Sequence, residues 1–494
     1  MKILHTLLLC SAGTSGLLLP AMPVMAQDSD PTAEEGTFDG ETIIVQARRR
    51  DEDVQDVPAV IDAVTAEEVT KLNLRDSKEV STLVPGLQLS TESNGVGGSA
   101  KLRGVNFDVN ASGFNSTVEF YMNDASITAG PIIQQMFDIG QIEVQRGPQG
   151  TLRGRAAPSG SITVTTRKPD LDGFGGTVDA TANTIGTTNL KAALNVPIIE
   201  GIAAIRVAGV LDQSDGDRVR SIYTRRDPHS KTKAGRISAL VEPADWLRLE
   251  GVYQHMERNA IAYDQSASFS EVNSSAPTSN PVISSKDRRS IQPYYRTVDQ
   301  KYDIFNWRAE TKLAGQALIY QGQHYTQKIL STTPQDEAVV FPNNKIEQPT
   351  DSRLKSTSHE IRLQNEERVA GLFDYVVGYY HADNNPPTDL IRRTPIRLPA
   401  LFGGGLAQVV DTPISRKGES KERSYFGNVT LHLSEATEIS GGARHIDYET
   451  DNILVVNGQT LTNSTLKGKK WIYSGSVKHN FSDDLMVYAS TGSS

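Results

Sequence analysis

The sequence of 494 residues contains one cysteine, Cys10, which lies in the apolar segment at the amino terminus. Small exported domains commonly depend on disulfides for their stability. With no second cysteine, this chain cannot form an internal disulfide. Its stability must therefore come from a large folded structure, and extended β-structure meets that requirement.

Long apolar runs are also missing. Beyond residue 26 no stretch reaches the roughly 18 apolar residues that a membrane-spanning helix needs. The mean hydropathy of −0.37 suits a soluble β-protein. It suits a transmembrane β-barrel equally well, because only alternate residues of a barrel strand face lipid. The order of apolar and polar residues along the chain is needed to distinguish these two classes.

Motifs for catalysis, metal binding or phosphate binding are lacking. The nine histidines include no H-E-x-x-H spacing. His255 with Glu257, and His359 with Glu360, are predicted to be exposed strand residues rather than metal ligands. The glycines at 95, 97 and 98 are not followed by the lysine and serine of a phosphate loop. We therefore expect no enzyme activity, no cofactor and no metal site.

The amino terminus has the features of an export signal. Lys2 precedes an apolar stretch over residues 3–19, and the small-residue motif Val24-Met25-Ala26 follows. Residues 1–26 are predicted to be a signal peptide, with a buried helix as the alternative. Residues 27–40 are acidic and rich in small residues, which predicts a flexible leader.

The most informative stretch is residues 138–168, where two segments of period-two alternation flank a loop rich in glycine and proline. This pattern alone predicts strand, turn and strand. The string IEVQRGPQGTLRG followed by SITVTTRKP resembles the signature of the plug domain of TonB-dependent outer-membrane receptors. PGLQLS, AKLRGV and TVEFYMNDASI resemble further plug motifs. The resemblance implies a plug domain over residues 51–170.

Two positions depart from the family pattern. Asn123-Asp124 stands where the family usually has an Asp-Gly turn, and Ser159-Gly160 stands where it often has Gly-Gly. Both substitutes tolerate turn conformations. We expect an altered local geometry and an intact fold.

A short β-branched segment, ETIIVQA, precedes three consecutive arginines. Such a segment can add as an edge strand to the sheet of another protein. It resembles the TonB box, through which TonB, with ExbB and ExbD, delivers energy to these receptors; the alternative is an ordinary first strand. Residues 41–50 are therefore interpreted as a box and a basic segment, the box being Glu41, Thr42, Ile43, Ile44, Val45, Gln46 and Ala47.

Residues 171–494 change to amphipathic strands joined alternately by short turns and long segments. Leu249 and Tyr253 alternate with Glu250 and Gln254, and long polar segments are expected near 259–297, 331–353, 384–419 and 451–470. Short turns at one end and long loops at the other are typical of an outer-membrane barrel. We predict a β-barrel membrane protein, partial because about thirteen of ~22 antiparallel strands can be placed, with an N-terminal α+β plug domain inside the lumen. The incomplete barrel predicts a chain truncated at its carboxyl terminus.

The family resemblance also implies a latch between plug and barrel. In the family two plug arginines pair with barrel glutamates, and Arg103 and Arg146 match those motif positions. Glu360 is predicted to face the lumen and is a candidate partner. The alternative for both arginines is a surface salt bridge.

The resemblance implies a receptor in the bacterial outer membrane that imports a ferric siderophore into the periplasm. Cobalamin, haem or an oligosaccharide are alternative ligands, and the ligand-binding residues stay open. A passive porin, a secreted β-rich glycosidase and a non-functional fragment are competing interpretations. A porin would lack the domain at 51–170, and a glycosidase would need two acids converging in a cleft.

Overall fold

The fold is given by a computed structural model, in which two units separate, Met1–Thr42 and Ile43–Ser494. Only the second unit is described. The predicted signal peptide and leader, together with Glu41 and Thr42, lie outside the described residues. The structure describes residues 43–91, 95–96, 98–105, 117–148, 150–153, 157–184, 186–216, 218–268, 277, 279–284, 286–336, 341, 344–399, 401, 406–482 and 485–493.

The plug is a small α+β domain, as the sequence predicts. Its central sheet has the order β3-β8-β9-β6-β7, with β6 and β9 parallel. Thr65 and Glu68 form the predicted capping box at the start of helix α1. None of the helices in the described part of the chain is long and apolar enough to cross a membrane. The plug elements are β3 (Ile61–Thr65), α1 (Ala66–Lys71), α2 (Ser77–Val80), β4 (Leu87–Thr91), β5 (Gly98–Leu102), β6 (Val118–Met122), β7 (Ala125–Ile127), α4 (Ala129–Gln134), β8 (Ile139–Arg146) and β9 (Gly160–Thr166).

The largest sheet of the described residues is antiparallel and has fifteen strands. Two of them, β21 (Thr388–Arg397) and β22 (Leu406–Lys417), form a hairpin between β20 and β23. The remaining thirteen strands, called the wall, pair in chain order. The sequence predicted about thirteen strands in all, so the sheet has two more than expected. The wall strands are β10 (Gly175–Ala182), β11 (Thr188–Ile199), β12 (Ala203–Ser214), β14 (His229–Ala244), β15 (Leu247–Ala262), β17 (Arg296–Leu313), β18 (Gln316–Pro334), β19 (Glu347–Asn365), β20 (Phe373–Asn385), β23 (Ser420–Ser434), β24 (Thr437–Val456), β25 (Gln459–Ser482) and β26 (Leu485–Gly492).

Two of the predicted long segments are wrong. The segment 384–419 contains the β21–β22 hairpin, which pairs with β19 and β24. The segment 451–470 consists of two strand ends joined by a two-residue turn, because β24 runs to Val456 and β25 starts at Gln459. The first nine residues of β25 are all exposed. A strand that is exposed on both faces has no apolar alternation, so its sequence cannot be distinguished from a polar loop.

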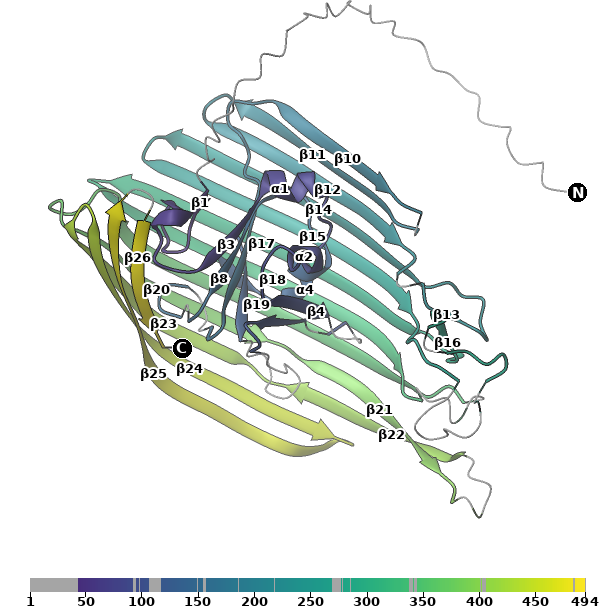
Figure 1. Ribbon diagram of the computed structural model, residues 1–494. Helices are drawn as coiled ribbons and strands as arrows, with labels where there is room; N and C mark the ends of the chain where they lie inside the picture. The colour runs from purple at the N-terminus through teal and green to yellow at the C-terminus, as the bar shows by residue number, and fades with distance from the viewer. Residues whose placement is uncertain are drawn as a thin grey trace, which may run out of the picture. The chain divides into compact units, whose positions relative to one another are not determined.

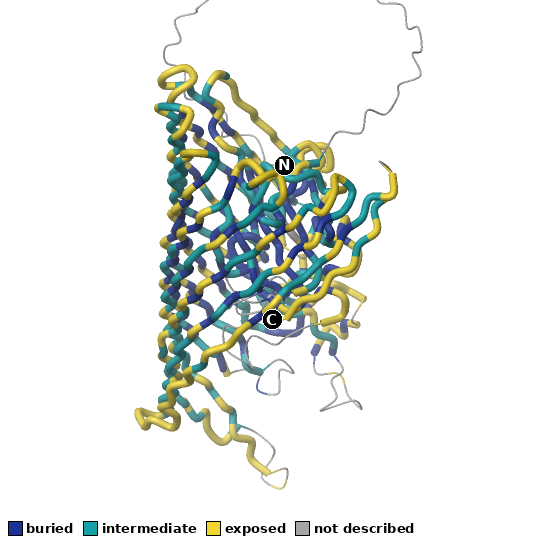
Figure 2. Tube along the Cα trace, turned by 90° about the vertical axis from the view of Figure 1, so that its left-hand side faces the viewer, coloured by how far each residue is buried: buried dark blue, intermediate teal, exposed yellow. Residues whose placement is uncertain are grey.

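Alternation along the wall separates an inner face from an outer face. On β19, Ile361 and Leu363 are exposed, whereas Glu360 and Arg362 are buried. Buried wall residues, including Tyr302 and Tyr325, belong to the same apolar core as the plug sheet. Figure 1 shows the plug lying against one face of the wall, and Figure 2 shows the buried positions gathered between them. The plug therefore covers part of the inner face, and the outer face is rich in apolar side chains.

Candidate functional site

The described residues of the predicted TonB box, 43–47, are folded onto the plug. Strand β1 (Ile44–Val45) pairs with β2 (Glu52–Asp53), and the 3₁₀ turn η1 (Val54–Asp56) follows. Val45 and Ala47 are buried and pack with Val57 in a small apolar cluster. The segment is therefore a paired strand here, whereas the sequence interpretation left its backbone groups unpaired.

Plug side chains hold the backbone of this segment. Arg153 donates from a guanidinium nitrogen to the carbonyl oxygen of Gln46 at 2.7 Å. The amide of Gln46 donates to Glu143 Oε1 at 3.2 Å, and Gln141 Nε2 donates to the carbonyl of Ile44 at 2.9 Å. These three polar contacts bind the backbone of residues 44–46 to plug side chains, in addition to the pairing of β1 with β2.

The chain then reaches three consecutive arginines, residues 48–50, called the arginine triplet. The middle one, Arg49, is fully buried. Its guanidinium lies 3.0 Å from Glu360 Oε2 on β19 and 3.2 Å from Asp124 Oδ1 on the plug. Its Nε donates to the carbonyl of Leu152 at 3.0 Å. Arg49 thus joins the N-terminal segment, the plug and the wall at one point.

Asp124 occupies the turn at which the sequence departs from the family pattern. Both Asn123 and Asp124 have positive φ, so the turn keeps the left-handed conformation that glycine would adopt easily. Burial by itself would raise the pKa of the Asp124 carboxyl. The nearby guanidinium groups of Arg49 and Arg153 outweigh this effect and hold that pKa well below its usual range.

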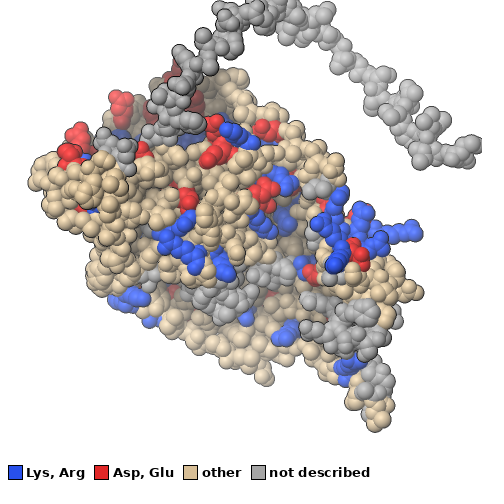
Figure 3. Space-filling model, viewed as in Figure 1, with Lys and Arg blue, Asp and Glu red and all other residues tan. Residues whose placement is uncertain are grey.

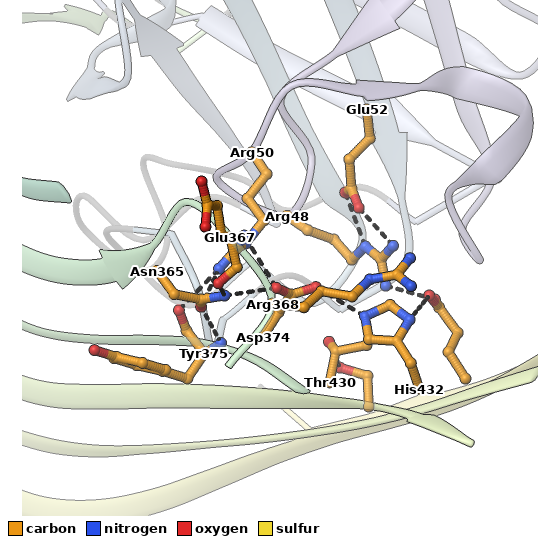
Figure 4. A network of polar contacts seen from close by, with 12 residues as sticks. Arg48, Arg50, Glu52, Asn365, Glu367, Arg368, Asp374, Tyr375, Thr430 and His432 are labelled. Carbon is orange, nitrogen blue, oxygen red and sulfur yellow. Dashed lines mark hydrogen bonds and ion pairs between the residues drawn. The ribbon is translucent and has the colours of Figure 1, made fainter. Parts of the chain in front are cut away.

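The two outer arginines of the triplet are bound at the same end of the wall (Figure 4). Arg48 lies 2.6 Å from Glu52 and 2.7 Å from Glu438 on β24. Arg50 donates to Asn365 Oδ1 at 2.6 Å and lies 3.4 Å from Asp374 on β20. The triplet therefore contacts three strands of the wall: Arg48 contacts β24, Arg49 contacts β19, and Arg50 contacts β19 and β20.

Further wall residues hold the plug independently of the triplet. Arg206 on β12 makes a two-point contact with Asp138, and Arg236 on β14 donates to the carbonyls of Phe137 and Asp138. Arg444 on β24 donates to the carbonyl of Arg153 at 2.8 Å. These contacts fix the plug even where the N-terminal segment does not reach.

The predicted latch residues are not brought together. Arg146 pairs with Asp62 of the plug at 2.5 Å, and Arg103 is exposed with φ at 52°. Glu360 faces inward as expected, but it contacts Arg49 and Arg362. The alternation of β19 predicts the face on which Glu360 lies. It does not predict which arginine contacts the Glu360 carboxylate. The signal that could have identified Arg49 is the arginine triplet itself, since buried like charges require nearby acids.

A plug on the inner face of an antiparallel wall with an apolar outer face defines the class of plugged outer-membrane barrels. The family model described as "TonB-dependent Receptor Plug Domain" matches residues 53–161. The model described as "TonB dependent receptor-like, beta-barrel" matches residues 215–494. The chain belongs to the TonB-dependent receptor family, and its place is the bacterial outer membrane. The family and fold are those of transport receptors rather than enzymes.

Several known proteins are similar to the chain. The pesticin receptor of Yersinia pestis is 24% identical over 441 residues, which cover 87% of this chain and 58% of that protein. The crystal structure of the ferric yersiniabactin uptake receptor of Yersinia pestis superposes with a TM-score of 0.72 at 18% identity, over 87% of this chain and 63% of that one. The ferric-catecholate import receptor of E. coli gives 0.67 at 14% identity, over 89% and 66%. These similarities establish the fold, and the chain spans 58% of the length of the curated relative.

Proposed function

We propose that the chain is a TonB-dependent receptor that imports a ferric siderophore into the periplasm with energy delivered by TonB, ExbB and ExbD. In this proposal residues 1–26 are a signal peptide, 27–40 a leader, 41–50 the box and basic segment, 51–170 the plug and 171–494 the barrel wall. The observation that carries it is the continuity between residues 43–47 and the arginine triplet on the wall.

The mechanism requires no covalent chemistry. The pairing between β1 and β2 is two residues long, so a strand of TonB can replace β2 by adding to β1. Tension on β1 then acts on residue 48 onward and draws the triplet away from Glu438, Glu360 and Asp374. Each broken contact leaves a charge to be solvated, so release requires work from outside.

A ferric siderophore is favoured by the names of the similar proteins. One is a ferric yersiniabactin uptake receptor, another a ferric-catecholate import receptor, and a further relative is an iron-regulated outer membrane virulence protein of Vibrio cholerae, 26% identical over 246 residues. Cobalamin, haem and oligosaccharides are the other ligands to be tested in the same assay.

The box is tested by replacing Val45 with proline in the full chain. Proline removes the backbone N–H donor of Val45, one of the two residues of β1, and prevents strand addition. We expect uptake of a ⁵⁵Fe-labelled siderophore by receptor-deficient cells to fall at least about tenfold, to the level of cells lacking TonB, with the amount of receptor in the outer membrane unchanged.

Val45→Ala is the matched control, because it removes the same packing but keeps the backbone donor. It is expected to retain most of the uptake. Uptake that is equal in cells with and without TonB would contradict the proposal.

A further inference from the structure

Two long connections of the wall fold together into a small lobe. They are the described residues of two segments, 215–228 between β12 and β14, and 263–295 between β15 and β17. Strand β13 (Arg220–Ser221) pairs in parallel with β16 (Arg289–Ser290). Ile283 and Ile291 form a buried cluster with Ile222 packed against it. The two connections are therefore held in a defined arrangement, called the basic lobe below.

Hydrogen bonds reinforce this arrangement. Ser221 Oγ donates to the carbonyl of Gln292 at 2.6 Å, and Tyr263 Oη donates to the carbonyl of Arg226 at 2.9 Å. Tyr263 also packs edge-to-face on Tyr295, with ring centroids 6.0 Å apart. The backbone that carries the charged side chains is thus tied to a buried core.

The surface of the lobe is strongly cationic, although the whole chain has a net charge of −9. Its first connection exposes Arg218, Arg220, Arg225 and Arg226. Its second connection exposes Lys286, Arg288 and Arg289. Among the described residues of these loops that stay exposed, the opposing carboxylates are Asp227, 3.0 Å from Arg220, and Asp287. Figure 3 shows lysine and arginine side chains gathered over the lobe on the side where the plug lies.

The strand pairing places like charges side by side. Arg220 is the register partner of Arg289. Cross-strand pairs of like charge are unfavourable, and the pairing of Arg220 with Asp227 offsets one of the two charges only. Arg225, Arg226 and Arg288 have no ion-pair partner among the residues that the structure describes. The fold therefore concentrates positive charge that internal contacts do not neutralise.

The lobe lies at the end of the wall opposite the arginine triplet. Strand β15 begins at the short turn after Ala244 and ends at Ala262, next to the lobe. Asp374 and Glu438, which bind the triplet, are the second residues of β20 and β24 and lie beside short turns. A ligand that enters from the long-loop end meets the lobe before it meets the plug.

We propose that the basic lobe is a collecting surface for an anionic ligand, and that the ferric chelate taken up by this receptor carries net negative charge. The inference rests on the proposed function for the direction of entry. Exposed charges act over a Debye length of about 8–10 Å and are weak individually. Several of them together raise the local concentration of an oppositely charged ligand and its association rate. Carboxylate and catecholate chelates of iron(III) are ligands of this class.

The test uses the purified full chain in detergent and two ⁵⁵Fe-labelled probes. One is a trianionic ferric tris-catecholate, and the other is a neutral ferric trihydroxamate. The wild-type protein should bind the tris-catecholate more tightly, and raising the salt from roughly 50 to 300 mM should weaken that binding at least about fivefold through screening. Tighter binding of the neutral probe, or no salt dependence, overturns the inference.

The charge variant is R225Q/R226Q/R288Q/R289Q, which keeps the Arg220–Asp227 pair. It should lose about tenfold or more in affinity for the tris-catecholate, mainly through a slower association rate. The matched control is K231Q/K233Q/K328Q/K355Q, which removes four exposed charges from the outer face of the wall and should leave binding unchanged. Replacing the same four arginines with lysine should restore binding.

Equal losses in the charge variant and the control would overturn the inference. Because binding is measured without cells, this outcome is independent of whether uptake requires TonB. Salt-dependent binding of the tris-catecholate combined with TonB-independent uptake would support the anionic ligand and contradict the proposed function.

Discussion

Arg49 is the residue at which three parts of the chain meet. Its buried guanidinium contacts Glu360 of the wall, Asp124 of the plug and the carbonyl of Leu152. Removing one member of a buried ion pair costs about 3–5 kcal/mol, because the remaining charges lose their partner. The stability of this site therefore depends on every buried charge having a partner of opposite charge, rather than on the number of charges.

Replacing Arg49 with glutamine should lower the free energy of opening of residues 43–53 by about 3 kcal/mol. Amide hydrogen exchange of this segment measures the change directly. Arg103→Gln is the control, because Arg103 is exposed, and it should leave the exchange rates unchanged. Equal protection in the Arg49 variant and the wild type would show that the contact does not hold the segment.

Asp124 should make the docking of this segment sensitive to acid. Its pKa in the folded protein is lowered, so its contribution to stability is present above the ordinary aspartate pKa of about 3.9. That contribution is lost as the pH falls below this value through the lowered pKa of the folded protein. In Asp124→Asn, hydrogen exchange should be faster than wild type at neutral pH and should lose this part of the acid dependence. An unchanged pH profile would contradict the assignment.

Single residues were predicted only in part from the sequence. The inward direction of Glu360 follows from alternation, and the positive φ of Asn123 and Asp124 follows from their place in a turn. The partner of Glu360, Arg49, cannot be predicted from alternation, because the contact depends on the three-dimensional path of the chain after β1. Arg146 shows the same limit, since its partner Asp62 lies on the neighbouring plug strand.

The wall strands differ in polarity along their length. On the outer face, Ile237 lies midway along β14, and its register partners are Val207 and Tyr253. Leu330 of β18 lies near the long-loop end. Its register partners are Asp299 on β17 and Asp351 on β19. An arginine facing the middle of a bilayer costs about 2–4 kcal/mol, whereas one near the interface costs about 0–1 kcal/mol.

Ile237→Arg should therefore reduce the folded fraction of receptor recovered from outer membranes, whereas Leu330→Arg should not. The two variants introduce the same side chain on the same face, and both of the replaced side chains are exposed, 53% and 39%. Heat-modifiable migration in gels measures the folded fraction. Equal recovery of the two variants would contradict the assignment of the outer face to lipid.

Strand positions were well predicted where one face is apolar and the other polar. The alternation along β15 and β19 and the capping box of α1 follow from local pattern. The β21–β22 hairpin, residues 451–456 of β24 and residues 459–467 of β25 do not, because none of their residues is buried and no apolar face alternates with a polar one. Their extended conformation comes from pairing with neighbouring strands, which a local pattern does not report.

At the scale of the whole unit, the N-terminal segment is connected to the wall through residues that touch both the plug and the strands. Arg48, Arg49 and Arg50 contact β24, β19 and β20, respectively. Other contacts, from Arg206, Arg236 and Arg444, hold the plug at separate points. Tension applied at β1 therefore reaches the triplet first and the remaining plug contacts afterwards.

The most direct test of this account is a reversible cross-link between β1 and β2. Ile44 and Asp53 are antiparallel register partners, a spacing that a disulfide can bridge, and the sequence has no cysteine beyond Cys10. With Ile44→Cys and Asp53→Cys oxidised, we predict that ⁵⁵Fe-siderophore uptake falls to the level of cells lacking TonB, that ligand binding is unchanged, and that a reductant restores uptake. Undiminished uptake by the oxidised receptor would contradict the claim that β1 must separate from β2 for transport.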